Sequence, residues 1–269
     1  PGMLNMICCP SGFLKYLSGN QRAYKVATYR FLKASLMNRP NSPIYMLHIG
    51  KTGGSYLRSL LKFNDAPWTR PLHLLGHGGT LKGTSKRFGQ DRQLAFVVRD
   101  PLTRFSSAFY SRQRQGRPTY QSRWSAEEAA AFLWFETAEE LALALTSSSE
   151  REKSAALFAF DAIQHLRGDL RHYLGGVDTL LAERDNIAVC ADLPDLDAHL
   201  PAFMARLGVP DFEMPSQPKT HAAPTSQPEL SAQAEAALRA HWAEEFAVYD
   251  TACDIARQLG FTGSARSPS

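Results

Sequence analysis

Three short apolar runs along the chain predict buried β-strands. They are IYMLHI (44–49), LAFVV (94–98) and NIAVCA (186–191), and polar or turn-forming residues flank each of them. A run of five or six mostly apolar residues without alternation is typical of a strand that is covered on both faces of a parallel sheet.

Apolar residues at helical spacing follow each predicted strand. The three helices expected after the strands cover residues 55–63, 101–115 and 195–208, the last ending at Gly208. Further helical patterns cover residues 11–37, 125–146, 150–174 and 229–259, whereas residues 64–93 form a glycine-containing loop region. Strands that alternate with helices predict an α/β fold: a P-loop-like, three-layer arrangement with a central, mostly parallel sheet flanked by helices.

Length and composition limit the number of domains. The chain has 269 residues, of which 44% are hydrophobic, and this is enough for one full core. The stretch Arg39-Pro40-Asn41-Ser42-Pro43 interrupts the helical pattern before the first strand. We therefore expect an N-terminal helical extension over residues 1–40 and a single domain over residues 41–269.

Charge and cysteine usage narrow the functional classes. The net charge of +4 suits an anionic ligand but is too small to indicate nucleic acid binding. The four cysteines show no metal-ligand spacing, and the adjacent pair Cys8-Cys9 is a poor disulfide framework, which favours a reducing compartment. No run approaches 18 apolar residues, so we expect no transmembrane segment and a soluble, cytoplasmic, bacterial-type protein. The opening Pro1-Gly2-Met3 resembles a cloning remnant, with Met3 as the natural start; loss of an N-terminal anchor by trimming is the alternative.

A glycine-containing turn after the first strand is the first candidate for chemistry. In HIGKTGGSY (48–56), a strand, a turn and a helix start gather backbone N–H groups at the positive end of a helix dipole, which favours phosphate. Glycines let the backbone approach a ligand closely. The residues expected to contribute are Lys51, Thr52, Gly53, Gly54 and Ser55. A tight turn with a surface lysine is the alternative. A Walker A loop does not fit, because its lysine follows the second glycine and Lys51 precedes both.

A second motif follows the second strand. Its sequence is RDPLTRFSSAFY (99–110), and together with HIGKTGGS it resembles the PAPS-dependent sulfotransferases, which use 3′-phosphoadenosine 5′-phosphosulfate as donor. The branch that it resembles most acts on carbohydrates of the heparan and chondroitin type (sulfotransferase family 2). The resemblance implies that the first loop binds the 5′-phosphosulfate. It also implies that an arginine at a strand end and a serine eight residues later bind the 3′-phosphate, and Arg99 and Ser107 have this separation.

The resemblance extends more weakly over residues 44–250, with two departures in the first motif. Gly50 replaces the usual proline before the lysine, and Tyr56 replaces a common serine. Tyr56 is expected either to stack on the adenine or to pack. The polar loop PKTHAAP contains Lys219 and His221. Lys219 is a candidate for the donor site, and a solvated loop lysine is the alternative.

The resemblance also implies a mechanism without a metal. Lys51 would stabilise the leaving phosphate oxygen, and His77, in LLGHGG, would be the base that takes the acceptor proton. A solvated loop histidine is the alternative for His77, and His48 is expected to be a satisfied core histidine. The expected partners are PAPS and a hydroxyl-bearing acceptor, in this family a saccharide; the oligomeric state is not predicted.

Basic and aromatic residues outside the two motifs give less information about function. Ten lysines and arginines form a candidate rim for an acidic saccharide or, equally, a solvated basic face: Lys62, Arg70, Lys82, Lys86, Arg87, Arg92, Arg104, Arg112, Arg114 and Arg117. The aromatic stretch FLWF (132–135) is expected in the core. Two other functions remain open: a kinase or transferase that uses a nucleoside triphosphate, and a non-catalytic anion- or glycan-binding protein.

Overall fold

The computed structural model describes residues 42–64, 68–89, 92–118, 120–216 and 227–261. The chain divides into two units, Pro1–Arg39 and Pro40–Ser269, and the described residues all belong to the second. The helical extension predicted for residues 1–40 lies outside the described residues.

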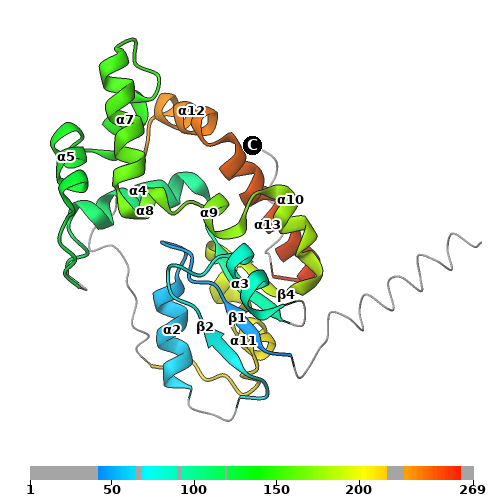
Figure 1. The fold of residues 1–269 in the computed structure, drawn as a ribbon. Coiled ribbons are helices and arrows are strands. Elements are labelled where there is room, and N and C mark those ends of the chain that lie inside the picture. Colours follow the sequence, from blue (N-terminus) through cyan, green and yellow to red (C-terminus); the bar gives the residue numbers. More distant parts are fainter. Residues whose placement is uncertain (1–41, 65–67, 90–91, 119, 217–226, 262–269) are drawn as a thin grey trace, which may run out of the picture. The chain divides into compact units, whose positions relative to one another are not determined.

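Four parallel strands form one sheet in the order β2-β1-β3-β4 (Figure 1). The strands are β1 (Ile44–Met46), β2 (Leu72–Leu74), β3 (Gln93–Val98) and β4 (Ile187–Asp192). The chain passes from β1 to β2 at one edge and then crosses back over β1 to β3. This change of direction makes the carboxyl ends of β1 and β3 a switch point, where open α/β sheets bind ligands. The predicted α/β class with a central parallel sheet is confirmed.

Successive residues of the strands face opposite layers of helices. On β3, Leu94, Phe96 and Val98 belong to one core cluster, and Ala95 and Val97 belong to another. The first cluster includes residues of α3 (Leu81–Phe88), α9 (Leu170–Leu174), α10 (Val177–Ala182) and α13 (Ala243–Leu259). The second includes residues of α2 (Gly54–Phe63) and α11 (Leu196–Leu207). Helices therefore cover both faces of the sheet.

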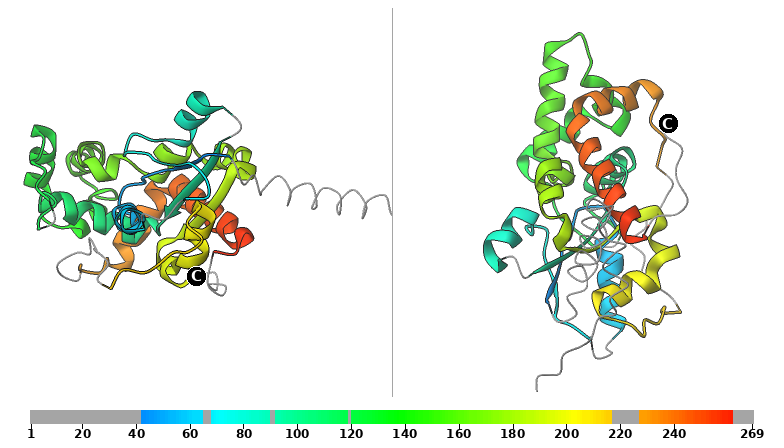
Figure 2. Two further views of the ribbon diagram at one scale, coloured as in Figure 1. Left: turned by 90° about the horizontal axis from the view of Figure 1, so that it is seen from below. Right: turned by 90° about the vertical axis from the view of Figure 1, so that its right-hand side faces the viewer.

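A third core cluster lies among helices alone. It joins α4 (Pro101–Gln113), α5 (Ala126–Trp134), α6 (Ala138–Ala144), α7 (Glu150–Ala162), α8 (Gln164–Arg167) and α12 (Ala232–His241). Helices α5, α7 and α12 lie together away from the sheet, toward the top of Figure 1 and of the right-hand view of Figure 2. Helix α4 leads from the carboxyl end of β3 into this cluster, where Phe105 and Phe109 are fully buried.

Several expected elements have different bounds. Residues 64–93 contain β2 and α3, which were not predicted. The expected helix 125–146 is divided into α5 and α6, and each part begins with its own capping box, at Ser125 and Thr137. The expected helix 150–174 is divided into α7, α8 and α9, and the last expected helix is interrupted at Trp242 between α12 and α13.

Three of the ten residues in the predicted basic rim are buried instead. Arg92, Arg104 and Arg112 are each at most 1% exposed and pair with Glu183, Glu245 and Glu128, respectively. The core prediction for FLWF is correct for Phe132 and Phe135, which are buried, and wrong for Leu133 and Trp134, which are 87% and 44% exposed. Among the described residues, no helix has both the length and the apolar character that crossing a bilayer requires.

The pair Arg112–Glu128 connects three helices. Arg112 donates to both carboxylate oxygens of Glu128 at 2.6 Å, and Glu128 also closes the capping box of α5 and accepts from the Gln164 backbone N–H at the start of α8. The pair also holds the chain before α5, because the Arg112 guanidinium donates to two backbone carbonyls there.

Removing one partner of this pair should therefore destabilise the protein strongly. We expect Glu128→Gln to lower the free energy of unfolding by about 3–5 kcal/mol, because Arg112 would remain buried without a counter-charge. Glu136→Gln, at an exposed position just after α5, is the control and should change it by less than about 0.5 kcal/mol. Urea denaturation of both variants measures the difference, and equal midpoints would contradict this role for the pair.

Candidate functional site

The loop between β1 and α2 has two residues in the left-handed backbone region. Their φ angles are 68° for Lys51 and 84° for Gly53. A left-handed residue among right-handed ones is the backbone arrangement of anion-binding nests. For a lysine this conformation costs about 1–2 kcal/mol, and such strained residues cluster at functional sites. The loop is anchored to the sheet because the Leu47 backbone N–H donates to the Ala95 carbonyl of β3 at 2.9 Å.

The predicted polar residues of the loop have different surroundings. Thr52 is 1% exposed, and its hydroxyl donates to the Ile49 carbonyl at 3.1 Å, so the hydroxyl closes the loop. The backbone N–H of Thr52 is thus the part of this residue suited to an anion. Ser55 is exposed on the first turn of α2. Gly53, the N-cap of this helix, makes no side-chain capping bond, so its cap leaves the N–H groups at the positive end of the dipole without a hydrogen bond from a capping side chain.

Both glycines of the loop are also required by packing within the chain. A β-carbon on Gly54 would lie 2.3 Å from Cδ2 of His48, and one on Gly53 would lie 2.7 Å from Cδ1 of Leu193. We expected these glycines to admit a ligand. In the structure, the space beside Gly54 holds the imidazole of His48.

The two sequence motifs meet at the carboxyl ends of β1 and β3. Arg99 follows β3, and its Nη1 donates to the Lys51 carbonyl at 3.4 Å while its Nε donates to the Thr103 hydroxyl at 3.1 Å. Thr103 and Ser107 are four residues apart on α4 and therefore lie on the same face of this helix. Arg99, Thr103 and Ser107 thus form a polar line that begins beside the loop.

Positive charge is concentrated at this point. The pKa of Lys51 is lowered to about 8, first by burial and then by the guanidinium groups of Arg114 and Arg99. Burial also lowers the pKa of Arg99, whereas Asp100 and Asp192 raise it. Within the described part of the chain, neither Lys51 nor Arg99 forms a salt bridge. A partly buried lysine beside two arginines favours an anionic ligand, which would relieve their mutual repulsion.

Three histidines lie beside the loop. The ring centroid of His77, in the loop after β2, is 4.0 Å from that of His48 and 6.2 Å from that of His165. Burial is the main reason that the pKa of His48 falls to about 4 and that of His165 to about 3. The pKa of His77 is also lowered, by burial and then by Arg58. All three rings are therefore neutral near pH 7, and a neutral imidazole is the form that accepts a proton.

A buried arginine and glutamate hold the segment that carries His165. Arg104 donates to the carbonyls of His165 (3.3 Å) and Gly168 (3.1 Å). Glu245 lies 3.3 Å from Arg104 and accepts from the backbone N–H groups of Leu170 and Arg171. The contacts that Arg104 and Glu245 make fix this segment between α4 and α13.

The same segment brings Tyr173 to the loop. A β-carbon built on Gly50 would lie 3.7 Å from the Tyr173 hydroxyl and 3.8 Å from Nδ1 of His165. His165 and Tyr173 were not predicted as site residues, because they come from more than a hundred residues beyond the loop. The only sequence feature that pointed to this segment was the tyrosine-leucine-glycine turn at 173–175, which is similar to a turn in the sulfotransferase family.

Two predicted donor-site residues are placed differently or not at all. Tyr56 packs against the core cluster shared by α2 and α11, and its hydroxyl donates to Asp197 at 3.2 Å, in agreement with the packing alternative. Lys219 and the neighbouring His221 lie outside the described residues.

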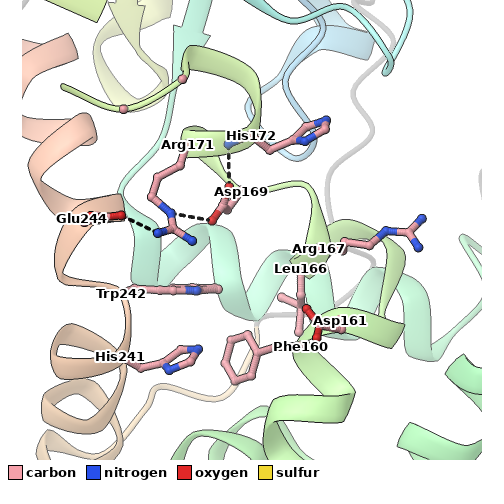
Figure 3. Close-up of a pocket in the computed structure, with 12 residues that line it drawn as sticks. Phe160, Asp161, Leu166, Arg167, Asp169, Arg171, His172, His241, Trp242 and Glu244 are labelled. Carbon is pink, nitrogen blue, oxygen red and sulfur yellow. Dashed lines mark hydrogen bonds and ion pairs between the residues drawn. The ribbon is translucent and has the colours of Figure 1, made fainter. Parts of the chain in front are cut away.

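A separate cavity lies beside the segment 164–176 (Figure 3). Its volume is about 590 Å³, and Phe160, His241 and Trp242 line it together with charged residues. One of these, Arg171, donates to Asp169 and to Glu244 across its wall, as Figure 3 shows. None of the predicted site residues lines this cavity.

No family model, curated protein or solved structure matches this chain. In the ranges that the structure describes, no group of three histidine, cysteine or carboxylate residues is arranged to hold a metal ion. The site therefore has to be interpreted from its own geometry: a strained loop, two converging cations and a neutral histidine beside them.

The strain at Lys51 can be measured without any ligand. We expect Lys51→Gly to raise the free energy of unfolding by about 1 kcal/mol, because glycine adopts φ 68° without steric cost and removes a repelled charge. Lys62→Gly, at an exposed position of α2, is the matched control and should lower it by about 1 kcal/mol. Thermal denaturation gives both signs, and a destabilised Lys51→Gly variant would contradict strain at this residue.

Proposed function

We propose that this chain is a PAPS-dependent sulfotransferase that transfers a sulfuryl group to a hydroxyl of an acceptor, and that the acceptor is a carbohydrate or glycoconjugate. The observation that carries the proposal is the contact between Arg99 and the Lys51 carbonyl. This contact brings the two motifs that resemble the donor site of that family to one point on the sheet edge.

The spacing of the polar groups supports a ligand with two phosphates. The loop backbone and the start of α2 suit the 5′-phosphosulfate, because uncapped N–H groups and Lys51 converge there. Arg99 offers a planar donor fork, and Thr103 and Ser107 continue along α4, which suits the 3′-phosphate. In this proposal Thr103 joins Ser107 as a contact of the 3′-phosphate.

The proposed reaction is an in-line displacement at sulfur. The acceptor hydroxyl oxygen forms a new bond to sulfur, and the bond from sulfur to the bridging oxygen of the 5′-phosphate breaks. The electron pair of that bond stays on the phosphate oxygen, where Lys51 stabilises the charge, and adenosine 3′,5′-bisphosphate leaves. His77 accepts the acceptor proton, which suits a neutral imidazole within the electrostatic influence of Lys51.

Two other functions make different predictions. A kinase or transferase that uses a nucleoside triphosphate would bind ATP in a Mg²⁺-dependent manner. A non-catalytic anion- or glycan-binding protein would bind the bisphosphate or a glycan without turnover of PAPS, and His77→Ala would leave its binding unchanged.

Binding of adenosine 3′,5′-bisphosphate tests the donor site directly. We expect titration calorimetry without metal to show much tighter binding of the bisphosphate than of 5′-AMP or ATP. Arg99→Ala should weaken the bisphosphate by about 10- to 100-fold, because a charge-assisted hydrogen bond is lost, and Ser107→Ala should weaken it less. Arg117→Ala, an exposed residue after α4, is the control and should bind as the wild type does. Equal affinity for the bisphosphate and 5′-AMP would overturn the proposal.

The pKa of Lys51 predicts how this affinity changes with pH. Protonated Lys51 is the binding form, and its pKa in the free protein is about 8. Affinity for the bisphosphate should be constant between about pH 7 and pH 7.5 and then fall by up to tenfold per pH unit above about pH 8. Lys51→Arg should keep its affinity to about pH 10, because arginine stays protonated. A wild-type affinity that is constant to pH 10 would show that Lys51 does not contact the phosphate as a cation.

A further inference from the structure

The ring of His48 lies between the loop after β1 and the loop after β2. It occupies the space beside Gly54, where a β-carbon would lie 2.3 Å away, and it faces His77 with the ring centroids 4.0 Å apart. A small cavity around it is lined by residues of three elements, including Arg58 of α2 and Leu75 after β2. Arg58 also joins these elements, because its Nη2 donates to the Leu75 carbonyl at 3.2 Å.

We propose that His48 is a positioning residue. Its ring packs against the His77 imidazole and so holds this imidazole beside the Lys51 loop. This inference rests on the proposed function, in which His77 accepts the proton of the acceptor. It replaces the expectation that His48 is only a satisfied core histidine, because one side of its ring contacts a surface histidine instead of the core.

The charged groups around His77 explain why the ring that packs against it has to be uncharged. Arg58 of α2 and Lys51 of the loop both disfavour its protonated form, whereas the His48 backbone favours it. His165 of α8 lies on another side at 6.2 Å between centroids. A second charge on His48, at 4.0 Å, would oppose the proton that His77 has to accept. Burial lowers the pKa of His48 to about 4, so His48 is neutral near pH 7.

Two substitutions of His48 separate the packing contact of its ring from its ability to take up a proton. His48→Phe keeps an aromatic ring beside His77 but has no ionisable group, and His48→Ala removes the ring. His73→Ala is the matched control, because His73 lies on β2, just before the loop that carries His77, and stacks on Tyr45 at 4.8 Å instead of on His77. Two readouts are made on the full chain: the pKa of His77, from NMR of labelled histidine, and the rate of PAPS hydrolysis with water as acceptor.

We expect His48→Phe and His73→Ala to resemble the wild type in both readouts. In His48→Ala, the His77 ring becomes hydrated, so its pKa should rise toward about 6.5 and the hydrolysis rate should fall about 10- to 100-fold. The affinity for adenosine 3′,5′-bisphosphate should change less than twofold in all three variants, which shows that they are folded. An unchanged His77 pKa in His48→Ala would overturn the inference. If the wild type neither binds the bisphosphate nor hydrolyses PAPS, the proposed function fails, whereas the His77 titration still decides the role of His48.

Discussion

The parallel pairing of β1 with β3 determines where the two segments of the candidate site lie. Ile44, Tyr45 and Met46 pair with Gln93, Leu94 and Ala95, so both strands end at the same edge of the sheet. The loop after β1 and the arginine after β3 then have to emerge side by side. The proposed anion site depends on this register, since Lys51 comes from one segment and Arg99 from the other.

Buried charges hold the rest of the site against this edge. Arg104 lies one turn into α4. Its hydrogen bonds to the carbonyls of His165 and Gly168 hold this distant part of the sequence beside the Lys51 loop. Glu245 of α13 satisfies the backbone of the same segment from the other side. Arg104 was expected in a basic rim, yet it is buried and acts as an internal support. At the candidate site, Lys51 and Arg99 form no salt bridge with any described residue.

The sequence predicted the elements whose signal is local. The buried strands, the turn that carries Lys51 and the arginine after β3 could be identified because apolar runs and short motifs report their own surroundings. Strand β2 was missed because it is a three-residue, half-exposed strand in a glycine-containing region. His165 and Tyr173 were missed because tertiary packing alone brings them to Gly50. The need for a glycine at position 54 could not be predicted either, since it depends on the direction in which the His48 ring points.

The central claim is that the loop after β1 and the start of α4 form one site for a ligand with two phosphates. A crystal structure of the protein with adenosine 3′,5′-bisphosphate is the most direct test. The account predicts the 5′-phosphate against the backbone N–H groups of residues 52–55 and the 3′-phosphate within hydrogen-bond distance of Arg99 and Ser107. A bisphosphate bound instead in the cavity beside Trp242, with the Lys51 loop unoccupied, would contradict it.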